Sequence, residues 1–265
     1  LVIPFFVMRK LGAKFSPSFD LKHPGVKKVF RLMLPVVLGL SLPGVYALIM
    51  QAFGSYYKDG INTALDLSNK LMQAPLGVFG QSLALAVFPA LTQFFAQERM
   101  DMFRQQLGST LRTVLYLTVP ISVLMLVMAP DVVALAYQYG KARTADLPAL
   151  VDSLRMFSFG IFAWCLHPVL MRAFFAVQQT VTPVLMGTAT TAVFLGLVFA
   201  LRPTSLSYLS LPLASSVSAI VLVCLLLLGI NRSLHGEKLD FQALLVTFGK
   251  SALASAAMGG VLWLG

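Results

Sequence analysis

The chain has 265 residues, of which 58% are hydrophobic and only 11% are charged, and its mean hydropathy is +0.83. Soluble domains carry charges on roughly a quarter of their residues, so this composition excludes an ordinary soluble globular protein. The net charge of +10 does not indicate nucleic-acid binding either, because no soluble domain with interleaved basic and aromatic residues is present. The composition therefore predicts a multi-pass membrane protein.

Seven uncharged stretches follow one another along the chain, and a helix needs about 20 apolar residues to cross a bilayer. None of them alternates with the period of two that is typical of an outer-membrane barrel. The Leu, Ala, Met and Phe content favours helices, which satisfy their backbone hydrogen bonds internally in lipid. The sequence predicts an all-α fold, a polytopic transmembrane helical bundle with about seven spans, at residues 32–54, 61–92, 110–129, 147–175, 180–201, 206–230 and 242–265.

The second and fourth of these spans, 61–92 and 147–175, are too long for one straight crossing. Each is expected to include a tilted, kinked or interfacial part. Pro75 and Pro89 are the predicted breaks in the second span, because proline removes a helical hydrogen bond and clashes with the preceding turn.

The distribution of Lys and Arg predicts how the bundle is oriented. Residues 9–31 contain seven basic residues and one Asp, which places this segment on the cytoplasmic side by the positive-inside rule. With that side fixed, the cytoplasmic loops hold thirteen basic residues and the outer loops hold four. The membrane topology therefore explains the excess of basic residues. In addition, residues 22–31 are expected to contact anionic lipid headgroups.

The second span carries a lane of polar residues, which is unusual in an apolar helix. Asp66, Asn69, Lys70 and Gln73 recur at helical spacing, and Gln81 continues the lane. Charged residues within a membrane usually face a bundle interior or a water-filled path, so the lane predicts a cavity wall. The alternative is that Asp66 and Lys70, which stand in the favourable i, i+4 order, only neutralise each other near the outer interface.

Patterns for catalysis or metal binding are missing from the sequence. Cys165 and Cys224 lie inside predicted spans, and the histidines have no carboxylate or cysteine at ligand spacing. No phosphate-binding glycine loop and no nucleophile elbow is present. We therefore expect no metal, no cofactor and no enzymatic activity. His167, next to Pro168, is expected to be a hydrogen-bonded packing residue, with a proton relay as the alternative.

Three stretches of the chain together resemble one family. They are His23-Pro-Gly-Val-Lys-Lys-Val-Phe-Arg-Leu-Met-Leu-Pro35, then Lys70-Leu-Met-Gln-Ala-Pro-Leu-Gly-Val-Phe79 with Phe88-Pro-Ala-Leu91, and Arg172-Ala-Phe-Phe-Ala176 with Thr182-Pro183. In this order they resemble the MurJ/MviN lipid II flippases of the multidrug, oligosaccharidyl-lipid and polysaccharide exporter superfamily. The resemblance runs along nearly the whole chain.

The resemblance implies fourteen helices in two six-helix lobes plus a final pair, of which this chain is similar to the C-terminal lobe. On that reading, residues 1–31 are the end of a preceding helix and a basic cytoplasmic loop, 32–230 form the six-helix lobe, and 231–265 form a cytoplasmic loop and the start of the final pair. The apolar stub 1–8 is too short to span, and the last span has no polar flank, so sequence is expected beyond both ends.

The resemblance also implies a function in the bacterial inner (plasma) membrane. Members of the family move lipid II, the undecaprenyl-diphosphate-linked peptidoglycan precursor, from the cytoplasmic to the periplasmic leaflet by alternating access. The implied partners are this lipid-linked glycan, membrane lipids and an N-terminal lobe of the same protein, and no nucleic acid. No catalysis is implied.

The family's cavity residues fall on the polar lane. Its arginine corresponds to Lys70, the acidic residue before it to Asn69, and the acidic position before the proline to Gln73. Lysine keeps a positive charge for a diphosphate but lacks the bidentate fork of arginine. We expect Lys70 to contact the diphosphate, and Asp66, Asn69 and Gln73 to line the cavity. Asp66 is assigned from the helix face alone.

Three other functions are alternatives on the sequence. The first is a related exporter of polysaccharide-linked lipids or drugs, and the second is a membrane scaffold that does not transport. The third is a membrane-embedded transferase that uses a lipid diphosphate. That chemistry usually needs several carboxylates that converge on a metal, whereas Asp66 is the single acid deep in a predicted span.

Overall fold

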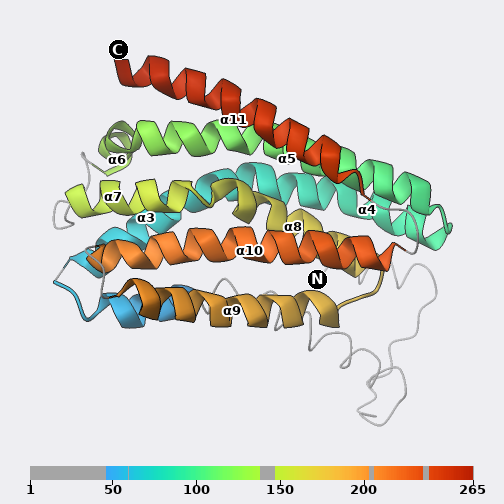
Figure 1. Cartoon of the computed structure of the whole chain (residues 1–265), viewed down its shortest axis with the longest axis horizontal. Helices are drawn as coiled ribbons and strands as arrows, with labels where there is room; N and C mark the ends of the chain where they lie inside the picture. The colour runs from blue at the N-terminus through green and yellow to red at the C-terminus, as the bar shows by residue number, and fades with distance from the viewer. Residues whose placement is uncertain (1–45, 59, 138–146, 203–205, 235–238, 265) are drawn as a thin grey trace, which may run out of the picture.

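The structure is a computed structural model that describes residues 46–58, 60–137, 147–202, 206–234 and 239–264 (Figure 1). Within these ranges the chain is helical and contains no strand. A helix over residues 46–54 comes first. The elements after it are α3 (Ile61–Pro75), the π-helix η1 (Leu76–Gln81), α4 (Ser82–Ala96), α5 (Met100–Val127), α6 (Ala129–Tyr137), α7 (Leu147–Ser158), α8 (Ile161–Ala176), α9 (Val181–Leu201), the 3₁₀ turn η3 (Ser207–Leu209), α10 (Ser210–Ser233) and α11 (Phe241–Leu264).

Six of the predicted spans have a counterpart in the described residues. Five continuous helical stretches are long and apolar enough to cross a membrane, and α7 with α8 forms a sixth, bent by 51°. This confirms the all-α, multi-pass fold. Of the predicted first span, residues 46–54 are described and are helical, whereas 32–45, like 1–31, lie outside the described residues.

The two long predicted spans are accommodated differently: 147–175 is bent, whereas 61–92 forms one continuous helical stretch. The stretch from Ile61 to Ala96 stays helical throughout, and its 36 residues would reach roughly 54 Å, so it must tilt or extend beyond a hydrocarbon core of about 30 Å. A π-helical turn begins directly after Pro75. The predicted break at Pro89 is wrong, because α4 continues through this proline. Transmembrane helices tolerate proline where neighbouring groups compensate for the lost hydrogen bond.

Helix α8 is the buried centre of the bundle. It packs against α4, α5, α10 and η1, and twelve of its sixteen residues are buried, including Phe174. The outer helices are much more exposed: α11 lies along α5 at one edge and α9 along α10 towards the other (Figure 1). Apolar side chains such as Leu185 on α9 and Leu253 on α11 are more than half exposed, as expected for surfaces that face lipid.

Small residues allow other elements to approach α8 closely. A Cβ on Gly80 of η1 would lie 3.0 Å from the Cα and carbonyl oxygen of Cys165, and one on Gly160, at the bend before α8, would lie 2.7 Å from the Cα of Ser216. Ser216 Oγ also donates a hydrogen bond of 2.8 Å to the Met156 carbonyl of α7. Close backbone approach at glycine and serine is typical of helix packing in membranes. These contacts fix η1 against α8, and α10 against the end of α7 and the bend that precedes α8.

Candidate functional site

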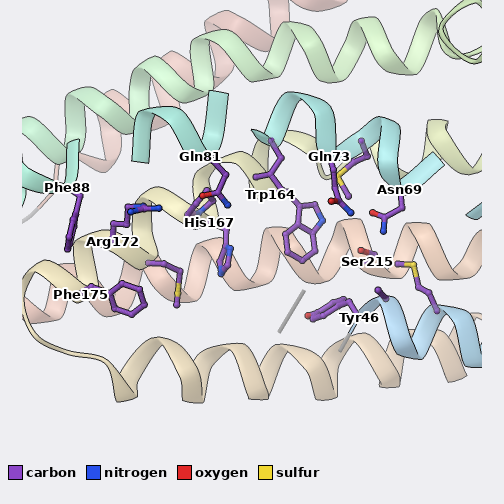
Figure 2. A pocket seen from close by; sticks show the side chains of 16 residues that line it. Tyr46, Asn69, Gln73, Gln81, Phe88, Trp164, His167, Arg172, Phe175 and Ser215 are labelled. Carbon is purple, nitrogen blue, oxygen red and sulfur yellow. The ribbon is translucent and has the colours of Figure 1, made fainter. Parts of the chain in front are cut away.

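A cavity of about 440 Å³ lies inside the bundle, between α8 and the helical stretch α3–η1–α4. The helix over 46–54 and α10 contribute the rest of its wall. Figure 2 shows the side chains that line it, with Phe88 and Arg172 towards one end and Tyr46 and Asn69 towards the other. The lining residues are Tyr46, Ala47, Met50, Asn69, Met72, Gln73, Leu76, Gln81, Phe88, Trp164, His167, Pro168, Met171, Arg172, Phe175 and Ser215.

One stripe of α8 forms a long wall of this cavity. The lining residues of α8 recur at helical intervals from Trp164 to Phe175, so they share one face. Three of them carry polar groups: the indole of Trp164, the imidazole of His167 and the guanidinium of Arg172 (Figure 2). From Trp164 to Arg172 the stripe extends about 12 Å along the helix axis.

The π-helical turn sets which residues face α8 from the other side. Leu76 and Gln81 both line the cavity, although residues five apart lie about 140° from each other on a regular α-helix. The i→i+5 hydrogen bonding of η1 brings such residues closer to one face. The turn thereby directs Gln81 into the cavity and leaves Gly80 buried against Cys165.

Two buried polar atoms on the α8 side of the cavity have no hydrogen-bond partner in the described part of the chain, and the hydroxyl of Tyr46, on another wall, is a third. Trp164 is only 6% exposed, and its Nε1 is unpaired, as is Nε2 of His167. The two rings meet edge-to-face with their centroids 6.1 Å apart. The expectation that His167 is a hydrogen-bonded packing residue is therefore wrong for Nε2. Buried polar groups are normally paired, so these two atoms indicate room for a ligand.

Among the described residues that line this cavity, the charged side chain is that of Arg172. The Arg172 guanidinium lies 6.0 Å from the ring centroid of Phe88, within range of a cation–π interaction. No carboxylate is found among the described residues that line the cavity, and none in the described ranges forms an ion pair with Arg172. The cavity therefore offers hydrogen-bond donors and a positive charge.

The structure divides the predicted polar lane of α3 between two faces. Asn69 and Gln73 line the cavity, as does Gln81 on η1. Asp66 and Lys70 do not: Lys70 Nζ lies 2.7 Å from Asp66 Oδ2, and both side chains are 61% exposed. A polar stripe is wider than the contact between two helices, so only one edge of it faces the cavity. The predicted i, i+4 ion pair between Asp66 and Lys70 is confirmed, and it lies on the outer surface of the described bundle.

The sequence does not predict the α8 side of the site. Trp164, His167 and Arg172 were available as an i, i+3, i+8 pattern, but the apolar surroundings hide it, because the helix is buried on nearly every face. Arg172 was counted as a cytoplasmic charge and as part of a family motif. Which face of a buried helix borders a cavity depends on the packing of its neighbours.

With this geometry established, comparison with known proteins places the chain. The profile described as "Lipid II flippase MurJ" matches residues 1–265, which is the whole chain. The chain belongs to the MurJ family. This confirms the resemblance found in the sequence, because the match covers every stretch on which that resemblance rested.

Relatives and a solved structure agree with membership of the MurJ family. The chain is 28% identical to the "Probable lipid II flippase MurJ" of Haemophilus influenzae, over 98% of this chain and 51% of the relative. It is also 28% identical to the Vibrio cholerae protein of the same name, over 98% and 49% respectively. A structure titled "Lipid II flippase MurJ, inward closed conformation" has the same fold, with a TM-score of 0.73 at 20% identity. It is covered over 53% of its length, and this chain over 99%.

The chain therefore spans about half the length of the MurJ relatives that it matches. It is a multi-pass membrane protein of helical fold that corresponds to one half of a longer architecture.

Proposed function

We propose that this chain is the C-terminal lobe of a lipid II flippase in the bacterial inner membrane. In this role it works with an N-terminal lobe of the same protein, and the two move the undecaprenyl-diphosphate-linked precursor from the cytoplasmic to the periplasmic leaflet by alternating access. Membership of the MurJ family supports this, as does the name lipid II flippase that the relatives carry. The half-length match supports the need for a second lobe.

The observation that carries the proposal is the exposed Asp66–Lys70 pair on a membrane-spanning helix. Both side chains are 61% exposed and lie within the stretch Ile61–Ala96, which is apolar enough to span. Charged groups within a membrane are costly when they face lipid and usually face a partner or a water-filled path. We infer that this face of α3 meets the second lobe across a water-filled cavity.

Lys70 is the proposed contact for the diphosphate. Its ammonium donates one hydrogen bond to Asp66 and keeps two further protons for a phosphate oxygen. Asp66 holds the lysine side chain in place, and Asn69 and Gln73 reach from the same helix into the cavity of the lobe. Helix α3 therefore separates the proposed substrate face from the interior of the bundle.

The decisive experiment is complementation in a bacterium depleted of its own flippase. The reading frame that encodes this chain is expressed with its flanking sequence, as the unaltered protein and as Lys70→Ala and Lys70→Arg. We expect growth with the unaltered protein and with Lys70→Arg, and no growth with Lys70→Ala, because the contact needs a positive charge.

A matched control separates this contact from general charge loss. Lys58→Ala removes an exposed lysine from the segment that precedes α3 and should still support growth. Membrane levels of each variant are measured by immunoblot. Normal growth with Lys70→Ala at an equal membrane level would contradict the assignment of Lys70. Lack of growth with the unaltered protein, despite its presence in the membrane, would contradict lipid II as the substrate.

A further inference from the structure

The interior cavity has a donor-rich wall that the proposed contact at Lys70 does not use. Trp164 Nε1 and His167 Nε2 are buried and unpaired, and Arg172 lines the same stripe of α8 without a carboxylate partner in the described ranges. Lys70 does not line this cavity. The stripe is therefore a separate set of groups within a single lobe.

The chemistry of these three groups selects the charge of a ligand. An indole N–H can only donate a hydrogen bond, and arginine carries five donors and no acceptor. A buried donor that is left without an acceptor costs free energy, and Arg172, which is half-buried, carries a charge without a carboxylate partner in the described ranges. His167 can present a proton on Nε2 in one neutral tautomer or when charged. An acceptor-rich anion satisfies all three groups, whereas a cation cannot satisfy the indole N–H of Trp164 or the guanidinium of Arg172.

The size and lining of the cavity narrow the ligand further. A volume of about 440 Å³ is much larger than the roughly 30 Å³ that one water occupies, so a polyatomic anion fits. Guanidinium groups match the oxygens of phosphate through paired hydrogen bonds. Phe88 and Phe175 form an apolar wall around Arg172, which suits a phosphate that carries a hydrocarbon chain.

We infer that the stripe Trp164–His167–Arg172 of α8 binds a phosphate-bearing anion inside the lobe, with Arg172 as the charged contact. The phosphate belongs either to an anionic lipid headgroup or to a free phosphate or pyrophosphate. Arg172 lies near the end of α8 that the orientation of the basic loops assigns to the cytoplasmic side, so the anion enters from that side. The inference rests on α8 and is independent of transport through Lys70.

The chain offers a direct optical probe for this site. It contains two tryptophans, so Trp263→Phe leaves Trp164 as the single one, with its indole in the cavity wall. The purified Trp263→Phe chain is placed in phosphatidylcholine nanodiscs and titrated with sodium pyrophosphate, with sodium phosphate and with sodium chloride at equal ionic strength. A parallel preparation contains phosphatidylglycerol nanodiscs. We expect a saturable change in Trp164 emission with a phosphate-bearing species and none with chloride.

The two nanodisc preparations distinguish the sources of the phosphate. A change that pyrophosphate or phosphate causes in phosphatidylcholine assigns the site to a free anion. A change that is already complete in phosphatidylglycerol, and to which pyrophosphate adds nothing, assigns it to a lipid headgroup. If none of these species changes the emission while circular dichroism shows a folded helical chain, the inference is overturned.

A matched pair of arginine substitutions tests the charged contact. Arg172→Gln should weaken binding about tenfold or more, because it removes a charge-assisted hydrogen bond. Arg99→Gln is the control, because the Arg99 guanidinium also lies 6.0 Å from an aromatic centroid, that of Phe94, but outside the cavity. Equal binding by the two variants would overturn the inference. Equilibrium dialysis of labelled pyrophosphate against the chain with both tryptophans gives the same comparison independently of fluorescence.

Discussion

Two polar regions of this lobe lie on either side of α3, and they satisfy their charges in different ways. On the outside, Asp66 and Lys70 form an ion pair at 2.7 Å and are largely exposed. Inside, Arg172 has an aromatic neighbour but no counter-ion in the described residues, and two nearby donors are unpaired. The charges of Asp66 and Lys70 neutralise each other, so this pair needs only a polar or aqueous environment in place of lipid. The charge of Arg172 is not neutralised by a described residue, so Arg172 needs an anion.

Reversing the outer pair should have the largest effect on function. In the double variant Asp66→Lys with Lys70→Asp the two groups can still form an i, i+4 ion pair, although in the less favourable order. Thermal stability in detergent is therefore expected to stay nearly unchanged, whereas complementation should be lost, because the cation has moved one turn along the helix. If the reversed pair supports normal growth, the pair is structural and Lys70 is not the diphosphate contact.

The inner region depends on close packing of the π-helical turn, which a single substitution can break. Gly80→Val places a branched side chain where a Cβ already meets the Cys165 backbone at 3.0 Å. We expect a loss of about 1–3 kcal/mol in the free energy of unfolding, because backbone cannot move aside as a flexible side chain would. Denaturant unfolding followed by circular dichroism measures it.

Gly77→Val is the matched control for Gly80→Val. A Cβ at the exposed Gly77 has nothing within 4 Å, so this neighbouring glycine should tolerate valine with a smaller change in stability. If both variants unfold at the same denaturant concentration, the packing of η1 against α8 is looser than the structure has it.

Removing an unpaired donor should have the smallest effect, and in the opposite direction. Trp164→Phe keeps an aromatic ring in the cavity wall but deletes the Nε1 proton that lacks an acceptor. We expect stability that is unchanged or higher by up to about 1 kcal/mol without ligand. Phe103→Leu, at a fully buried ring with no polar atom, should instead cost about 1 kcal/mol in the same assay. A loss of stability in Trp164→Phe clearly larger than that in Phe103→Leu would contradict an unpaired Nε1, because the lost ring volume alone accounts for a smaller loss.

Much of the fold could be predicted from the sequence because a bilayer imposes strong local rules. A stretch of about 20 apolar residues must be helical, so the spans from residue 61 onward follow from composition alone. Helix α5 begins at Met100, ten residues before the predicted span 110–129, because a helix can continue through charged residues that composition excludes from a span. The sequence predicts a break at Pro89 because the hydrogen bond that proline removes is a local one, whereas the groups that compensate for it come from neighbouring helices.

The candidate site could be predicted only on one side. Asn69 and Gln73 stand out on an otherwise apolar helix, so their spacing predicts a shared face, and the structure brings both to the cavity. The same spacing could not separate them from Asp66 and Lys70, because a stripe of residues carries no information about where the neighbouring helix ends. Trp164 and His167 lie at helical spacing, but the sequence does not show that they share a cavity wall, since their helix is buried on almost all sides.

The sequence by itself determined the helical membrane fold, the ion pair of α3 and membership of the family, because each depends on residues that are near one another along the chain or on a pattern that runs through it. Only the tertiary structure decided that the polar lane divides between two faces. It also decided that a π-helical turn directs Gln81 towards α8, and that Arg172 shares a cavity with two unpaired donors. These features arise from contacts between helices distant in sequence, and the positions of such contacts depend on side-chain packing that no single helix specifies.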